Sequence, residues 1–126
     1  MAALVRERFG TDWQRANLVV VGDFNDQPAS PFVHPLVGMG LVNVVERLPP
    51  GERWTHYWDK KNSVSQLDYI LLTKRLAQAS PKVPYIERRG LVRKRKMPGP
   101  AALFAGVTSR IGASDHCPVV MEIVVK

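Results

Sequence analysis

Residues 19–26, VVVGDFND, decide the fold expected for this chain. An apolar, β-branched run ends in a glycine, and acidic and amide side chains follow it. This pattern is typical of a buried strand that delivers polar groups to a site at its C-terminal end. Alternate residues of a strand share a face, so we expect Asp23 and Asn25 to project together while Phe24 packs. A tight turn is the alternative, because Gly, Asp and Asn tolerate unusual backbone angles.

A carboxylate beside a carboxamide suits metal-assisted attack on a phosphate. The Asp23 carboxylate would bind a cation or orient water, and the Asn25 amide would donate to a phosphoryl oxygen without adding negative charge.

Helices and strands alternate along the rest of the chain. Helices are expected over 2–9, ended by Gly10, and over 30–37, where Ser30 is the N-cap. Strands are expected over 18–21, 53–58, 67–73 and 118–125, with a short one over 82–86. The run 41–45 is ambiguous between strand and helix, and 59–65 is a polar, hairpin-like loop. At least three strands are apolar on both faces, which indicates an α/β sheet layered by helices or by a second sheet.

The chain has 126 residues, which suits a single domain over 1–126 with a hydrophobic core. No apolar run approaches the roughly 18 residues that span a membrane, and the first eight residues are too short and too polar for a secretory signal. The single cysteine, Cys117, excludes an internal disulfide and fits a cytoplasmic location. Because proline and an apolar run follow it, we interpret Cys117 as a packed thiol.

A net charge of +7 favours anionic partners, nucleic acid among them. A solvated basic surface is an equal alternative. The cations crowd into 87–108, which we expect to be a mobile basic loop. Arg93 and Lys94 within it are candidate contacts to a phosphate backbone. No aromatic residue lies between Arg88 and Lys96, so base stacking is not expected there.

Two further clusters carry chemistry. Asp115 and His116 lie immediately before the last expected strand, where an acid and an imidazole can serve a cation and a phosphate. Asp68 lies in an apolar strand, and a buried carboxylate is costly without a partner. His116 is the natural partner, whose tautomer and orientation Asp68 would fix. A hydrated Asp68 at the strand entrance is the alternative. His56, in an aromatic strand, is interpreted as packing.

Three motifs occur in order: GDFN at 22–25, QLDYILL at 66–72 and SDHCPVV at 114–120. Together they resemble the endonuclease/exonuclease/phosphatase superfamily, which includes deoxyribonuclease I. The resemblance covers 2–125 and is to the C-terminal half of such a domain. It implies an α/β fold, half of a four-layer α/β-sandwich, with a mixed sheet and flanking helices.

The resemblance also implies roles. Asp23 would position the attacking water or serve the leaving group, and Asn25 would hold the scissile phosphate. Asp68 would support His116, which would contact the phosphate, and Asp115 would bind Mg²⁺ or Mn²⁺. The expected function is a metal-dependent, nuclease-like phosphoesterase, or the catalytic C-terminal half of one. The alternative is a catalytically incomplete binding or assembly module that keeps the fold and a basic surface.

One departure from the family bears on partners. Members are longer, and upstream of Asp23 we find no candidate for the family's metal-binding Glu. A lone half would also expose an apolar face, which soluble proteins rarely do over a large area. We therefore expect the chain to pair with a second copy of itself or with a separate N-terminal half.

Overall fold

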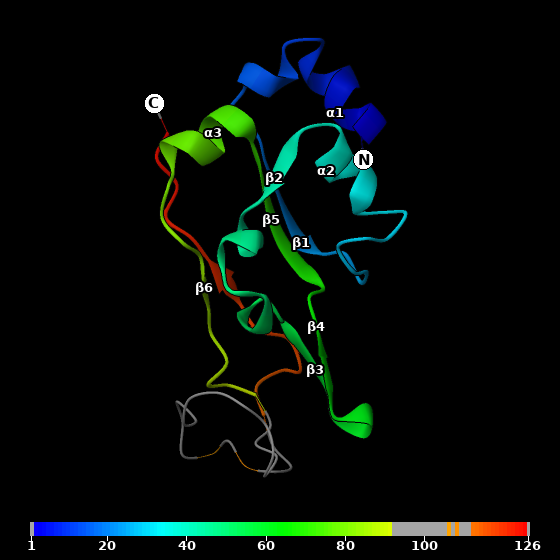
Figure 1. Ribbon diagram of the computed structural model, residues 1–126, viewed down its shortest axis with the longest axis vertical. Helices are drawn as coiled ribbons and strands as arrows, with labels where there is room; N and C mark the ends of the chain where they lie inside the picture. Colours follow the sequence, from blue (N-terminus) through cyan, green and yellow to red (C-terminus); the bar gives the residue numbers. More distant parts are fainter. Residues whose placement is uncertain (1, 92–105, 107, 109–111, 126) are drawn as a thin grey trace.

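A three-stranded sheet forms the centre of the protein. A computed structural model describes residues 2–91, 106, 108 and 112–125 (Figure 1). The sheet has the order β1-β5-β2, from β1 (Val19–Asp23), β5 (Asp68–Thr73) and β2 (Leu41–Asn43). The predicted strand over 67–73 is confirmed, and the ambiguous run 41–45 divides into β2 and a 3₁₀ turn.

Two short antiparallel strand pairs extend the structure beyond this sheet. β3 (His56–Trp58) pairs with β4 (Ser63–Ser65), and β6 (Tyr85–Ile86) pairs with β7 (Val119–Val120). The expected strands over 53–58, 82–86 and 118–125 are thus present in shortened form. The predicted strand over 118–125 differs most from the structure. Only Val119–Val120 pair as a strand, because the described residues after Val120 have no regular backbone pairing.

Short helices connect the strands. α1 (Ala2–Phe9) ends where predicted, at Gly10, whose φ of +67° suits a residue without Cβ. α2 (His34–Gly38) begins later than predicted, although the Ser30 hydroxyl does accept a hydrogen bond from the Val33 N–H. α3 (Lys74–Ala79) follows β5 directly and was not predicted. The 3₁₀ helices are η1 (Trp13–Arg15), η2 (Val44–Arg47), η3 (Pro50–Glu52) and η4 (Asp59–Lys61).

The expected mixed sheet is wrong for the described strands, all of which pair antiparallel. β1 and β2 run in the same direction, but β5 lies between them and runs the opposite way. The fold is α/β in the coarse sense that it combines a β-sheet with helices packed against its faces. The four-layer sandwich stays a prediction.

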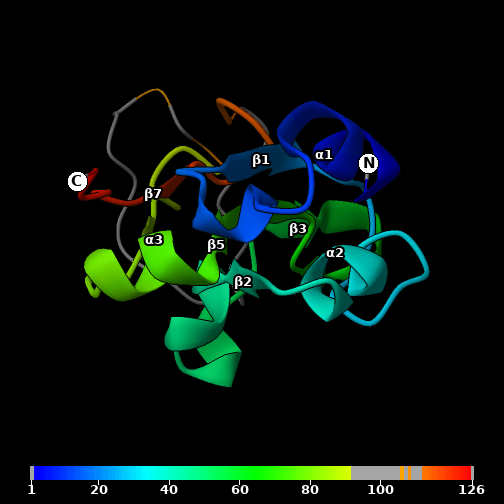
Figure 2. The ribbon, with the colours of Figure 1, turned by 90° about the horizontal axis from the view of Figure 1, so that it is seen from above.

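Two layers of side chains cover the central strand β5, which is buried on both faces. On one face, Val5 of α1, Leu36 of α2 and Val33 just before α2 pack against Tyr69 and Leu71. On the other face, α3 and the segment after β7 pack around Ile70 and Leu72. Figure 2 shows α1 and α2 together on one side of β5 and α3 with β7 toward the other.

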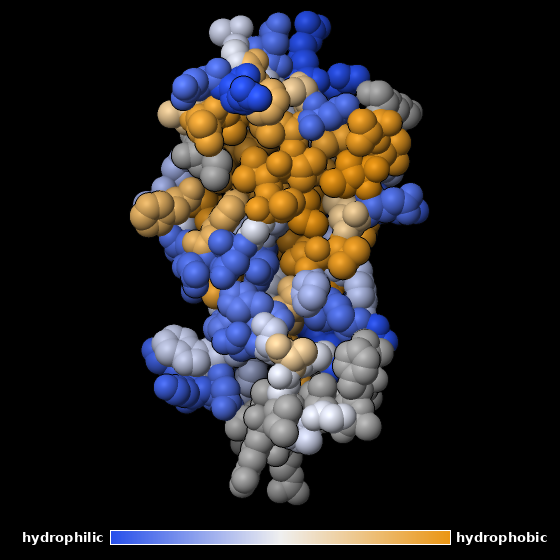
Figure 3. Space-filling view, turned by 180° about the vertical axis from the view of Figure 1, so that it is seen from behind, coloured by the Kyte–Doolittle hydropathy of each residue, from blue (hydrophilic) through white to orange (hydrophobic). Residues whose placement is uncertain are grey.

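β1 differs from the prediction that it is buried on both faces. Val20 packs against the α1–α2 layer, whereas Val19 is 37% exposed and Val21 is 60% exposed. The physical reason is that β1 is the edge strand and no described element covers its second face. Apolar side chains gather over a broad area of the molecule in Figure 3. This exposure agrees with the expected partner, which stays a prediction. No described helix is long and apolar enough to cross a membrane.

We expect Leu71→Ala to lower the free energy of unfolding by about 2–5 kcal/mol, because Leu71 is fully buried beneath α1 and α2 and the change leaves a cavity. Leu4→Ala is the matched control on α1, where Leu4 is 58% exposed, and should cost less than about 0.5 kcal/mol. Urea denaturation measures both values. Equal losses in the two variants would contradict the packing described here.

Candidate active site

A carboxylate and an imidazole face one another at the end of the central sheet. Asp68 is the first residue of β5, and His116 lies just before β7. His116 Nδ1 is 2.9 Å from Asp68 Oδ2. A carboxylate only accepts hydrogen bonds, so Nδ1 carries the proton and Nε2 points away from Asp68. The structure thus brings together the two residues that the sequence analysis paired.

Asp23 joins this pair from the neighbouring strand. In the antiparallel register Asp23 lies directly opposite Asp68, which places both carboxylates on the same face. Asp23 Oδ2 is 3.9 Å from His116 Nε2. The ligand atoms of Asp23, Asp68 and His116 all lie within 4.8 Å of one another. These three residues form the three-residue cluster discussed below.

Asn25 reaches the site by a turn. Its φ of +51° takes the chain out of the strand after Asp23, a conformation that asparagine tolerates. The Asn25 backbone N–H donates to Asp23 Oδ1 at 2.8 Å, and its Nδ2 lies 3.4 Å from Asp23 Oδ2. The expectation that strand alternation aligns the two side chains is therefore wrong. The tight turn considered as the alternative is present, and its hydrogen bonds bring Asn25 to Asp23.

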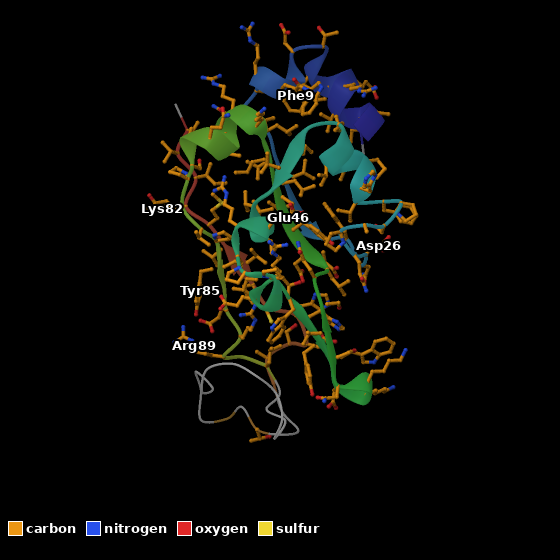
Figure 4. All side chains as sticks on the ribbon, in the orientation of Figure 1. Phe9, Asp26, Glu46, Lys82, Tyr85 and Arg89 are labelled. Carbon is orange, nitrogen blue, oxygen red and sulfur yellow. The ribbon has the colours of Figure 1, made fainter. Side chains whose placement is uncertain are left out.

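Tyr69 holds this turn in place from beneath. Its hydroxyl donates to the backbone oxygen of Asp26 at 2.7 Å, and its ring stacks on Phe24 with centroids 5.2 Å apart. Figure 4 shows Asp26 in the loop that follows β1. Burial, followed by the negative charges of Asp26 and Asp68, raises the pKa of Tyr69, so the phenol remains a hydrogen-bond donor.

Thr55 anchors the start of β5 and was given no role from the sequence. It is fully buried, and its Oγ1 accepts hydrogen bonds from the backbone N–H groups of Leu67 and Asp68, both at 3.0 Å. These bonds fix the backbone from which the Asp68 carboxylate projects.

His56 lies in the site, although its sequence context indicated packing. Its ring centroid is 4.8 Å from that of His116, and its Nε2 is 3.7 Å from Asp115 Oδ2. Backbone pairing explains this position, since Tyr57 N–H donates to Asp115 O and an isolated bridge joins His56 to His116. No local sequence signal reveals a pairing between segments sixty residues apart.

Asp115 stands apart from the three-residue cluster. Its side chain is 73% exposed and faces His56. Among the described residues, the group able to hold a metal ion consists of Asp23, Asp68 and His116. Asp115 as a metal ligand stays a prediction. Arg93 and Lys94, the candidate phosphate contacts, lie outside the described residues, as does most of the segment 87–108.

A hollow of about 680 Å³ opens beside the cluster. Asp23, Asp68 and His116 are among its lining residues, together with apolar side chains that include Val21 and Val119. Cys117 also borders it, but burial raises the pKa of this thiol to about 12. A thiol that stays protonated is a poor nucleophile, in agreement with its interpretation as a packed residue.

The acidic neighbours decide the charge of His116. Desolvation by burial lowers its pKa, but the Asp68 hydrogen bond and the charges of Asp68, Asp23 and Asp115 together outweigh it, so the pKa of His116 is raised above 6.5. Because the folded pKa exceeds the unfolded one, this charge stabilises the fold fully below about pH 6.5. That stabilisation is lost as the pH rises through the folded pKa of His116.

The donor set of the cluster fits a hard divalent cation in its chemistry. Asp23 and Asp68 offer carboxylate oxygens, the ligands that Mg²⁺ and Mn²⁺ prefer. One Asp68 oxygen is already engaged by His116 Nδ1.

We expect Asp68→Asn to lower the pKa of His116, because it removes the charged acceptor from Nδ1 and one of three nearby negative charges. NMR titration of the metal-free protein, followed at the histidine Cε1 protons, measures the shift. The resonance of His34, an exposed residue of α2, should not respond to the substitution. An unchanged His116 titration would rule out the contact as the source of its raised pKa.

The comparisons with known proteins give one match. The model of the Endonuclease/Exonuclease/phosphatase family matches residues 1–116. Comparison with curated proteins finds no match, and comparison with solved structures finds none. The matched range holds Asp23, Asn25, Asp68 and His116, and it spans nearly the whole chain. The chain therefore belongs to the endonuclease/exonuclease/phosphatase family.

Proposed function

We propose that this protein is a metal-dependent phosphoesterase that hydrolyses phosphodiesters in the manner of a nuclease. The observation that carries the proposal is the convergence of Asp23, Asp68 and His116 within 4.8 Å beside a hollow. Membership of the family supports a phosphoesterase, and the cluster supplies the groups for one.

His116 is the group that would face the phosphate. Asp68 holds its ring through Nδ1, which leaves Nε2 on the side of Asp23. The raised pKa favours the protonated imidazole, whose Nε2–H would donate to a phosphoryl oxygen and stabilise charge that develops there.

Asp23 and Asn25 would act on the nucleophile and the phosphate. The Asp23 carboxylate would orient the attacking water and accept its proton, or serve the leaving group. The Asn25 N–H and Nδ2 both point at Asp23, so the turn presents the carboxylate in a fixed orientation. The Asn25 amide would then donate to a phosphoryl oxygen when substrate enters.

A divalent cation would be held by the carboxylates of Asp23 and Asp68, with Asp115 as a further candidate ligand. When bound, Mg²⁺ or Mn²⁺ would polarise the phosphoryl group.

A second candidate function is a binding module without turnover. The engaged oxygen of Asp68 and the position of Asp115 favour it, because they leave few free oxygen ligands around the cluster. The net charge of +7 would still attract phosphates.

We expect Mg²⁺- or Mn²⁺-dependent hydrolysis of bis(p-nitrophenyl) phosphate that EDTA abolishes. Asp23→Ala, Asn25→Ala and His116→Ala should each lower the rate by about 100-fold or more, the loss typical of a positioned acid, base or donor. Asp12→Asn is the matched control, because Asp12 is exposed and makes no side-chain cap hydrogen bond. Release of p-nitrophenolate measures all five proteins.

Calorimetric titration with Mn²⁺ separates the two candidate functions. Metal binding without hydrolysis would favour the binding module, and turnover that survives His116→Ala would reject the catalytic role given to this residue.

A further inference from the structure

The tip formed by β3, η4 and β4 presents an exposed aromatic ring. Trp58 ends β3 and is 45% exposed, whereas the other two tryptophans, Trp13 and Trp54, are only 6% and 7% exposed. An indole left in water at the end of a small hairpin contributes little to a core. Core packing therefore does not explain why a tryptophan lies at this position, and a binding role does.

Strand geometry places this ring on the same face of β3 as His56. Residues 56 and 58 of β3 share a face, while Tyr57 between them is buried in the opposite direction, against Trp54 and Cys117. His56 on that face contacts His116 and Asp115. Trp58 lies one same-face step beyond His56, about 7 Å farther along the strand. The indole therefore extends the three-residue cluster outward from the end of the sheet.

Cations accompany the indole. Lys61 Nζ lies 4.2 Å from the centre of a Trp58 ring, and Lys60 is exposed beside it in the same turn. Asp59 is the one acid of η4. The turn is held in shape, since the Tyr57 hydroxyl donates to Asn62 Oδ1 at 2.8 Å and Asn62 adopts a left-handed φ of +47°. A π-face and a positive charge are thus presented together by an ordered turn.

We propose that this tip, residues 56–65, is a binding arm for a nucleic-acid strand. A base would stack on Trp58, and the backbone phosphate next to it would contact Lys61. That the strand's scissile phosphate would then lie at His116 rests on the proposed function. The binding of the strand to the arm does not depend on the proposed function. The substrate class of the site would then be a single-stranded or locally opened nucleic acid.

The chemistry of the tip favours a nucleobase over the other phosphate carriers of this kind of enzyme. An inositol phosphate has no flat aromatic face for an indole, so it would use Lys60 and Lys61 without Trp58. A lipid surface needs a broader apolar area, and here the indole is flanked by Asp59, Lys60, Lys61 and the polar residues Asn62 and Ser63. Base–aromatic stacking needs only one ring and an adjacent cation.

The arrangement of tryptophans supplies a direct test. We expect a single-stranded oligonucleotide of about eight nucleotides to quench the tryptophan fluorescence of the full chain in EDTA and low salt, because Trp58 is the exposed indole. Anisotropy of a labelled oligonucleotide then gives affinities for the variants. Trp58→Leu should weaken binding about 10-fold, and Trp58→Phe should restore most of it. Lys61→Gln should reduce the slope of log affinity against log salt by about one.

Lys74→Gln is the matched control for charge, because Lys74 is exposed on α3, at the opposite end of the molecule from β3 and β4 (Figure 1). The affinity of Lys74→Gln for the oligonucleotide should fall less than that of Lys61→Gln, because only the overall charge of the protein changes. Circular dichroism of each variant confirms that it is folded.

Unchanged affinity in folded Trp58→Leu, or no oligonucleotide binding by the parent chain at low salt, would overturn the proposal. Equal quenching by anionic phospholipid vesicles or by inositol hexakisphosphate would assign the arm to those ligands instead. The binding measurement uses no metal and can be repeated in His116→Ala. Failure of hydrolysis therefore leaves this result standing, and failure of binding leaves the phosphoesterase test standing.

Discussion

The hydrogen bond between Asp68 and His116 joins parts of the chain that are far apart in sequence, and the site depends on it. Asp68 begins the strand that is buried on both faces, where an unpartnered carboxylate would be costly. Thr55 holds the backbone of Asp68, and His116 satisfies the carboxylate. The segment that carries His116 is in turn paired to β3. The partners that the Asp68 carboxylate needs at the start of β5 therefore bring the β3 hairpin, the central sheet and the C-terminal segment together at this site.

Two carboxylates and one imidazole set the charge of the cluster. Asp23 and Asp68 lie directly opposite one another across the β1–β5 ladder, an arrangement that is destabilising for like charges. The neighbouring His116, whose pKa is raised, offsets part of this repulsion. Natural sheets avoid such pairs unless something else needs them, so the facing carboxylates are themselves an argument that the cluster serves chemistry.

The parts of this structure that the sequence predicts are those that follow from local physics. The apolar run 67–73 predicts β5, and the cost of burying Asp68 predicts its contact with His116. Long-range pairing is not visible in the same way. The edge position of β1 leaves Val21 exposed, and the bridge between β3 and the segment before β7 brings His56 into the site. α3 was missed because it starts directly after a strand, and its N-cap residue Thr73 directs its hydroxyl to the Ala16 carbonyl instead of capping the helix.

The buried thiol next to the cluster is a natural gauge of local opening. Cys117 is 2% exposed, its backbone N–H donates to Thr55 O at 2.6 Å, and it is covered by the same hairpin that positions His56. A small maleimide or disulfide reagent reaches so buried a sulfur only when the segments packed around it open locally, either on the side of the hollow or on the side of β3. The labelling rate of the one cysteine in the chain therefore measures how often this part of the site opens, without any engineered probe.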